Sequence, residues 1–177
     1  MQTTPDYQKG LKVQSISDFV IILINGSINS GKSTVAKLIA NKLKQSALIE
    51  IDSFHEMIEW MPIDKAIPLN LKNAVSVIKN FSENKINSIV PYPLSEKNYK
   101  YLIDSLKSTG ERIELFTLAP RLEQVLKNRG KREITEWEKE RIKHHYKIGI
   151  PKLSFGDIID NTNQTPEETA EKILKSL

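Results

Sequence analysis

The sequence predicts an α/β fold, in which a five-stranded parallel sheet is covered by helices on both faces in three layers. Short apolar, β-branched segments alternate with segments of helical periodicity, and repeated strand–helix units form such sheets. The 177 residues suffice for one domain, and 39% hydrophobic with 27% charged residues is typical of globular proteins. Residues 1–18 are polar and without a clear period, so we expect an N-terminal extension there and a single domain over 19–177.

The first half of the domain is expected to supply three strands, at Phe19–Asn25, Ala47–Asp52 and Ile86–Val90. Between the first two, Lys32–Lys44 repeats apolar residues at helical spacing and predicts a helix. Residues 53–84 also have helical periodicity, which Pro62 and Pro68 are expected to interrupt because proline lacks the amide donor.

The second half is expected to supply two more strands, at Arg112–Ala119 and Phe155–Ile159. Ser95 is a helix-capping residue and predicts a helix to about Ser108. Pro120 is expected to open the next helix. Two capping boxes, beginning at Thr135 and Thr165, predict a helix to about Lys147 and a final helix at the C-terminus.

The pattern G-x-x-x-x-G-K-[ST] follows the first predicted strand, at Gly26–Ser33, and a helix-like run follows it. In this strand–loop–helix context the pattern forms a phosphate-binding loop (P-loop), whose backbone N–H groups and helix N-terminus attract phosphate oxygens. Lys32 would reach the β- and γ-phosphates, and the Ser33 hydroxyl would ligate Mg²⁺. The expected nucleotide-binding residues are Gly26, Ser27, Asn29, Ser30, Gly31, Lys32, Ser33 and Thr34.

Composition excludes several other classes of function. There is no cysteine, so disulfides, thiolate metal sites and thiol nucleophiles are excluded. The net charge of +4 comes from scattered lysines, which suits an anionic ligand but does not indicate nucleic-acid binding. The longest apolar run, Phe19–Ile24, is too short to span a bilayer, and residues 1–6 do not resemble a signal peptide. We therefore expect a cytoplasmic protein, either a monomer or a homodimer, without membrane or nucleic-acid partners.

Asp52 is the candidate catalytic acid–base residue. It closes the second predicted strand, and ligands of parallel α/β sheets bind at the carboxyl ends of the strands. A carboxylate there would accept the proton of an attacking hydroxyl or help to hold Mg²⁺. A third interpretation is that Asp52 only caps the helix that follows it. The third strand ends at Val90-Pro91 without an acidic residue. We therefore expect Asp52 to be the carboxylate that helps to bind Mg²⁺, together with the hydroxyl of Ser33.

Several segments resemble one group of small phosphotransferases. The P-loop is the specific feature of the resemblance, which spans about residues 19–177. Ile51–Met57 with Met61-Pro62 is similar to chloramphenicol phosphotransferases, and Ile89–Pro91, Leu115–Pro120 and Ile159–Thr162 resemble tunicamycin-resistance ATP-binding proteins. Both belong to P-loop kinases of the nucleoside-monophosphate and shikimate kinase-like fold.

That resemblance implies a three-layer P-loop NTPase fold, ATP and Mg²⁺ as cofactors, and a small hydroxyl compound as acceptor. It also implies a mobile lid around residues 127–134, where Arg129 and Arg132 would clamp phosphates during transfer. Arg121 and Arg141 are weaker candidates for the same role. Asn161 and Thr162 would lie beside the adenine ring, mainly through backbone contacts.

The remaining aromatic and imidazole groups have alternative interpretations. His55 and Tyr92 are candidates for contact with the acceptor, whereas His144 and His145, adjacent on one helix, are expected at the surface. Met57, Trp60 and Met61 would either line an acceptor pocket or, as we prefer, pack in the core.

Two functions remain open from the sequence. The first is transfer of the γ-phosphoryl group of ATP to a hydroxyl of a metabolite or antibiotic, and the alternative is a nucleotide-dependent binding protein or simple ATPase. GTP-dependent switching is not expected, because the nearest match to the base-reading N-K-x-D motif, Asn84–Asn87, lacks the acid.

Overall fold

All five strands of the sheet run parallel, in the order β2-β3-β1-β4-β5. The structure is a computed structural model that describes residues 19–128 and 133–177. The strands are β1 (Val20–Gly26), β2 (Ser46–Leu48), β3 (Asn87–Pro91), β4 (Arg112–Leu118) and β5 (Asp157–Ile159). The predicted five-stranded parallel sheet is therefore confirmed, with β1 buried at its centre.

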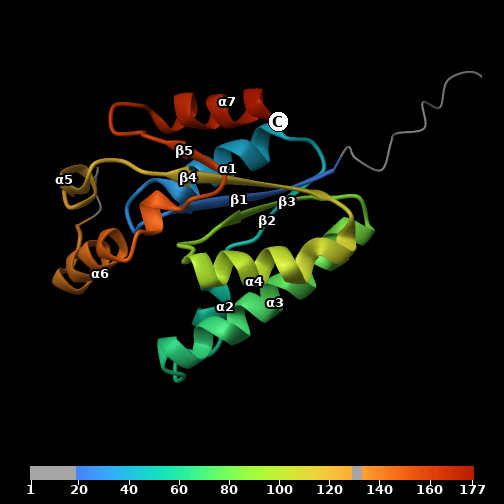
Figure 1. Ribbon diagram of the computed structural model, residues 1–177, viewed down its shortest axis with the longest axis horizontal. Coiled ribbons are helices and arrows are strands. Elements are labelled where there is room, and N and C mark those ends of the chain that lie inside the picture. The colour runs from blue at the N-terminus through green and yellow to red at the C-terminus, as the bar shows by residue number, and fades with distance from the viewer. Residues whose placement is uncertain (1–18, 129–132) are drawn as a thin grey trace, which may run out of the picture.

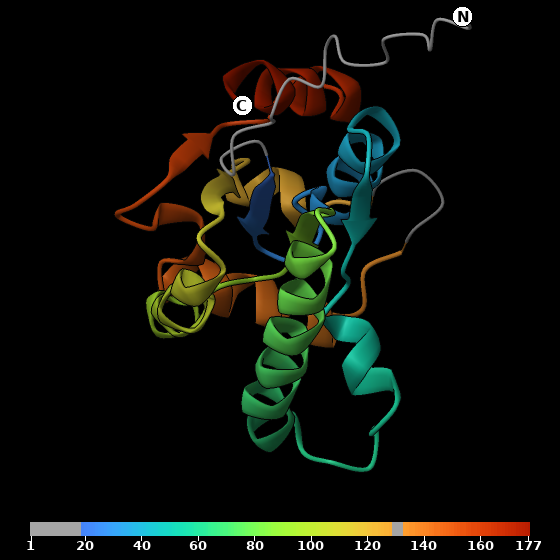
Figure 2. The same ribbon diagram turned by 90° about the vertical axis from the view of Figure 1, so that its right-hand side faces the viewer.

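Helices cover both faces of the sheet, which confirms the three-layer prediction (Figures 1 and 2). On one face α1 (Lys32–Lys42) packs against α7 (Pro166–Ser176), and their apolar sides meet β1 and β4 in one core cluster. On the other face α3 (Ile63–Glu83) and α4 (Glu96–Leu106) enclose a second cluster with β1 and β3. This division follows from the two-residue period of β1, which directs alternate side chains to opposite faces.

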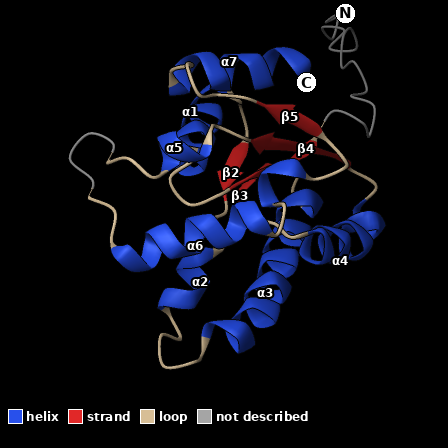
Figure 3. Cartoon of the chain, turned by 60° about the vertical axis from the view of Figure 1, so that its left-hand side comes forward, coloured by secondary structure: helices blue, strands red, loops and turns tan. Residues whose placement is uncertain are grey.

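Three further helices lie beyond the carboxyl ends of the strands: α2 (Asp52–Glu56), α5 (Leu122–Val125) and α6 (Glu136–Lys147). Figures 1 and 3 show α5 and α6 at that end of the sheet. The buried side chain of Asn25 ties the segments together there, donating to Ile150 O at 2.8 Å and accepting from Leu94 N at 2.8 Å. A single amide thus fixes the chain after α6 and the chain after β3 against the end of β1.

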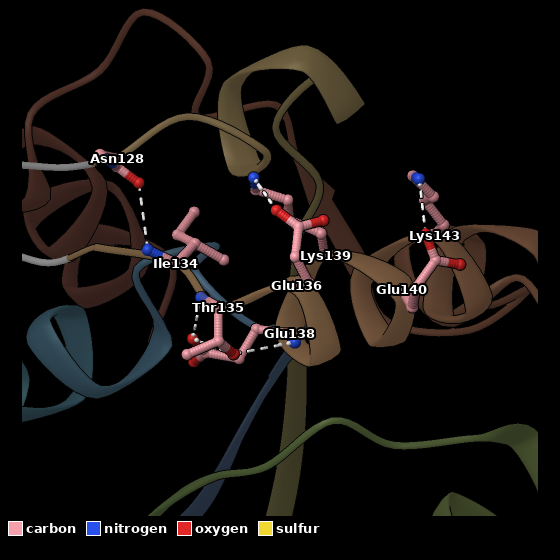
Figure 4. A network of polar contacts seen from close by, with 8 residues as sticks. All are labelled: Asn128, Ile134, Thr135, Glu136, Glu138, Lys139, Glu140 and Lys143. Atoms are coloured by element: carbon pink, nitrogen blue, oxygen red, sulfur yellow. Dashed lines mark hydrogen bonds and ion pairs between the residues drawn. The ribbon is translucent and has the colours of Figure 1, made fainter.

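The three predicted capping residues are confirmed. The Ser95 hydroxyl accepts from Asn98 N at 3.3 Å at the start of α4. Capping boxes begin both α6, at Thr135, and α7, at Thr165. Figure 4 shows the α6 box, in which the Glu138 carboxylate accepts from Thr135 N at 3.0 Å while the Thr135 hydroxyl accepts from Glu138 N at 3.2 Å. These local bonds fix where each helix begins.

Some predicted boundaries were wrong. Pro68 does not interrupt the second helical segment: α3 runs continuously through it, because Pro68 lies on the exposed side of the second turn while Ala66, Asn70 and Leu71 remain buried. Pro62, by contrast, stands at the N-cap of α3, after α2 has already ended at Glu56. Pro120 precedes α5 by two residues instead of opening it.

The second strand is shorter than predicted. β2 ends at Leu48, and only one further backbone bond, from Ile49 N to Ile89 O, continues its pairing. β2 is an edge strand with β3 as its neighbour, so little holds the chain extended once Ile49 and Ile51 turn into the core. Asp52 therefore begins α2 and does not end β2. Within 19–128 and 133–177, no helix combines the length and apolarity needed to cross a bilayer.

Candidate active site

Gly26 allows the P-loop to turn sharply out of β1. Its φ is +148°, and a Cβ there would lie 2.5 Å from Ser30 Oγ and 2.7 Å from the carbonyl oxygen of Leu118. Gly31, with φ +95°, stands at the N-cap of α1. Both predicted glycines thus occupy positions that a side chain would obstruct or strain, and this conformation directs the loop backbone inward.

The N-terminus of α1 opens onto the loop. Among the described residues no side chain caps this terminus, and its first turn contains no acidic residue. Its amide donors and partial positive charge therefore suit an anion. Lys32 begins the helix and its Nζ donates to Ser27 O at 2.8 Å, which places the ammonium group across the loop.

Side-chain contacts with distant segments hold the loop in place. Asn161 Nδ2 donates to Ser30 O at 3.0 Å. Asn29, with φ +61°, donates to Val125 O at 2.9 Å and also to Lys127 O. His145 Nδ1 lies 3.3 Å from Ser27 Oγ. Asn29 and Asn161, both predicted to bind nucleotide, use their amide nitrogens to position the loop.

A cavity of about 860 Å³ joins the P-loop to α2, α3, the segment after β3, and α6. Its volume falls in the range of small-ligand sites. Of the predicted residues, it brings together Asn29, Gly31, Lys32, Ser33, Thr34 and Asp52, with His55 and Tyr92. Asp52 and the P-loop therefore share one site, although Asp52 lies beyond the strand on which the prediction placed it.

Surrounding protein raises the pKa of Asp52 above its usual 3.8. Burial within the cavity is the main cause, and Glu50 and Glu56 add to it, whereas Lys32 acts in the opposite direction. As a residue, Asp52 remains exposed to solvent. The N-cap of α2 is Ile51, and no side-chain bond caps this helix within the described part of the chain. Helix capping therefore does not explain Asp52.

Helix α6 contributes residues that the sequence interpretation underrated. Glu138, Arg141 and His145 all line the cavity, at the spacing of three to four residues that marks one face of a helix. The sequence favours Arg129 and Arg132 over Arg141 as phosphate clamps, but those two residues lie outside the described part of the chain. The spacing of Arg141 with His145 on a charge-dense helix was the signal that could have identified this face.

His145 corrects the expectation of two surface histidines. His144 is exposed, but His145 is only 3% exposed. Burial lowers the pKa of His145 to about 4, and the positive charges of Arg141 and Lys32 contribute. The imidazole is consequently neutral at physiological pH, and it links α6 to the P-loop through Ser27 without adding charge.

The aromatic residues divide between cavity and solvent. Tyr92 lines the cavity, where burial and the nearby Asp52 raise the pKa of its hydroxyl to about 12, so it remains a hydrogen-bond donor. Core packing was the wrong expectation for Met57 and Trp60, which are 75% and 79% exposed. The short α2 ends at Glu56, before this pair, and the turn to α3 carries both side chains outward.

The site fits a magnesium ion held mostly by a nucleotide. Within the described residues, no cluster of three or more acidic or imidazole groups could hold a metal alone. Ser33 is exposed at the helix N-terminus and lines the same cavity as Asp52. Mg²⁺ is usually bound through one or two protein oxygens with phosphates and water, and these two residues supply such oxygens.

Comparison with known proteins identifies the fold. No protein-family model matches the sequence, and no curated protein matches it either. A tunicamycin resistance protein of Deinococcus radiodurans has a similar structure, with TM-score 0.64, 20% identity, and coverage of 89% of this chain and 95% of that chain. A sugar kinase from Janibacter sp. HTCC2649 gives TM-score 0.69 at 17% identity, over 89% and 93% of the chains.

Shikimate kinase from Acinetobacter baumannii, solved in complex with shikimate, is also similar, with TM-score 0.59 and 19% identity over 91% and 94% of the chains. The Mycobacterium tuberculosis APS kinase gives TM-score 0.62 at 16% identity, over 90% and 97%. All of these identities are low, so what the chain shares with these proteins is the P-loop kinase fold, as the resemblance of its segments implied.

Proposed function

We propose that the protein transfers the γ-phosphoryl group of ATP to a hydroxyl group of a small molecule. The observation that supports this most directly is the single cavity in which Asp52 faces the phosphate-binding loop. That cavity extends past the P-loop along α2 and α3, which leaves a wall for a second substrate. A simple ATPase or nucleotide sensor has no need of this wall. The P-loop kinase fold of structures such as the sugar kinase and APS kinase is consistent with the proposal.

The roles of the residues follow from their positions. Backbone amides of the P-loop and the N-terminus of α1 would bind the phosphates, with Lys32 neutralising their charge. Ser33 and Asp52 would hold Mg²⁺, which when bound neutralises charge on the transferring phosphates. Arg141 enters the cavity from α6 and would stabilise the oxygens of the migrating group, because a guanidinium matches phosphate geometry.

Asp52 would act as the general base. As the acceptor oxygen forms its bond to the γ-phosphorus, the hydroxyl proton passes to the Asp52 carboxylate, while the bond to the bridging oxygen breaks and ADP leaves. A raised pKa suits this role, because it makes the carboxylate a better proton acceptor. Tyr92, which stays protonated, would orient the acceptor by donating a hydrogen bond.

The test is ATP turnover with and without a panel of hydroxyl compounds, with Lys32→Ala measured in parallel. We expect acceptor-dependent ADP release by the parent protein and loss of tight ATP binding by the variant in calorimetric titration. Lys32 is half-buried at the loop, so the variant should remain folded. ADP release that no acceptor stimulates would favour a simple ATPase. Equal ATP affinity of the two proteins would remove the loop as a nucleotide site.

A further inference from the structure

The acceptor side of the cavity has a composition of its own. We define the acceptor wall as His55 and Glu56 of α2 with Ile63, Ile67 and Asn70 of α3, all of which line the cavity. The three α3 residues are four and three positions apart, so they lie on one face of that helix. This face belongs to neither the P-loop nor α6, which supply the cations of the cavity, and it is where a second substrate would rest.

The one charged group of the acceptor wall is the carboxylate of Glu56. Asp52 lies one turn earlier on α2 in the same cavity, and among the described residues of α2 and α3 that line the cavity none is a lysine or arginine. The cations of the cavity are Lys32 in the P-loop and Arg141 on α6, which phosphate binding requires. A substrate carboxylate, sulfate or phosphate on this wall would meet like charges without a compensating cation.

Two buried polar atoms of the wall lack partners within the described structure: Asn70 Oδ1 and His55 Nδ1. Asn70 is only 3% exposed, so its amide oxygen faces neither bulk water nor a protein donor. Leaving such a group unsatisfied is unfavourable, and a ligand that supplies the missing bond gains affinity. The Asn70 oxygen needs a donor, which a hydroxyl or amide offers and an ionised carboxylate does not.

The wall also offers apolar surface. Ile63 of the wall is 44% exposed. Trp137 of α6 and Ile148, the C-cap of α6, line the same cavity outside the wall and are 63% and 51% exposed. Exposed apolar side chains that gather at a cavity indicate a ligand with an apolar part. A fully hydrated polyol would leave them uncovered.

We propose that the acceptor is an uncharged, amphipathic alcohol, with hydrogen-bond donors toward Asn70 and an apolar face toward Ile63 and Ile67. This inference rests on the proposed phosphotransferase function and narrows it. It places carboxylate-bearing acceptors, such as the shikimate bound by the structurally similar kinase, outside the preferred class of this protein. Glu56 and Asn70 are then residues that determine specificity.

Binding to matched compounds tests the class. Calorimetric titration, with ADP and Mg²⁺ present, would compare shikimate with its methyl ester, which differ in charge, and would include gluconate, chloramphenicol and the polycation kanamycin. We expect the ester and chloramphenicol to bind at least about tenfold more tightly than shikimate and gluconate, a difference of about 1.4 kcal/mol. Equal affinity of ester and acid, binding of kanamycin alone, or binding of no compound would overturn the proposal.

Charge reversal at Glu56 tests the charge of the acceptor wall, and charge reversal at Glu59 is the matched control. Glu56→Lys should shift the ester-to-acid affinity ratio about tenfold toward shikimate. Glu59→Lys makes the same change on an exposed residue that does not line the cavity, and should leave the ratio unchanged. Equal shifts in both variants would refute a local charge effect.

Asn70→Leu provides a readout that separates ligand binding from folding. Removing an unpaired buried amide should leave the free energy of unfolding unchanged or higher while weakening binding of the ester. A variant that loses stability and retains affinity would overturn the role of Asn70.

Measuring phosphoryl transfer with the same compounds separates this inference from the proposed function. Binding of uncharged alcohols without transfer would contradict the phosphotransferase and leave the acceptor wall as assigned. Preferential phosphorylation of shikimate would support the phosphotransferase and overturn the acceptor class.

Discussion

Replacing Asp52 by asparagine removes a charge from the lining of the cavity with little change of shape. The side chain caps no helix in the described structure, so the substitution should not disturb α2. Because burial raises the pKa of Asp52, its ionised form is disfavoured in the folded state. At neutral pH the variant should therefore be as stable as the parent or more stable, and that gain should disappear as pH falls below the pKa of the folded state.

The expected loss of activity is far larger than the change in stability. Removing a general base typically costs a factor of roughly 10² to 10⁴ in rate, which corresponds to about 3 to 5 kcal/mol of transition-state stabilisation. The acidic limb of the pH profile of kcat/KM should report the Asp52 pKa, and should lie above the usual value of 3.8. That limb should be absent in Asp52→Asn.

Phosphoryl transfer and ATP affinity, measured across a Mg²⁺ series at several pH values, distinguish the roles of Asp52. A rate lost at every Mg²⁺ concentration with ATP affinity preserved indicates a base. Recovery of the rate at high Mg²⁺, with weakened ATP binding at low Mg²⁺, indicates a metal ligand. An unchanged rate under all conditions would refute the catalytic assignment, and with it the main reason for preferring a kinase to a binding protein.

Three further changes test the surroundings of the P-loop. Gly26→Ala should destabilise the fold by about 1 to 3 kcal/mol in urea denaturation, because the new methyl would lie 2.5 Å from Ser30 Oγ at a φ of +148°; a stability equal to that of the parent would refute the steric argument. Arg141→Ala should reduce kcat more than it weakens ATP binding, and the converse would make it a ground-state contact. The pKa of His145 falls from 6.5 to about 4 on folding, so the unfolded chain binds this proton first as pH drops. The free energy of unfolding should therefore decrease by up to about 3 kcal/mol between pH 6.5 and 4. His145→Asn, which cannot titrate, should lose that pH slope in thermal denaturation, and a slope retained in full would assign it to other groups.

Local patterns were sufficient to predict most of the fold. The P-loop, the capping residues Ser95, Thr135 and Thr165, and the alternation of strands and helices all depend on residues within a few positions of one another. Failures occurred where tertiary packing outweighed a local signal. Pro68 continues in α3 because buried neighbours hold the helix on both sides of it.

The candidate site was predictable only in part, for the same reason. Lys32 and Ser33 belong to a contiguous motif, and they line the cavity as expected. Arg141 and His145 reach that cavity because α6 crosses the carboxyl end of the sheet, a placement that no neighbouring residue specifies. The predicted clamp at Arg129 and Arg132 lies outside the described residues and stays a prediction.

The P-loop depends for its shape on three side-chain contacts with distant segments, and not on its motif alone. The bonds from Asn29, His145 and Asn161 join residues 96, 118 and 131 positions apart in the sequence. A peptide spanning residues 20–45 would contain every letter of the pattern and none of these three connections. Loop closure over such separations is slow compared with helix formation. During synthesis, the loop can make all three contacts only after the chain through Asn161 has left the ribosome, so nucleotide affinity would report that β5 has been completed.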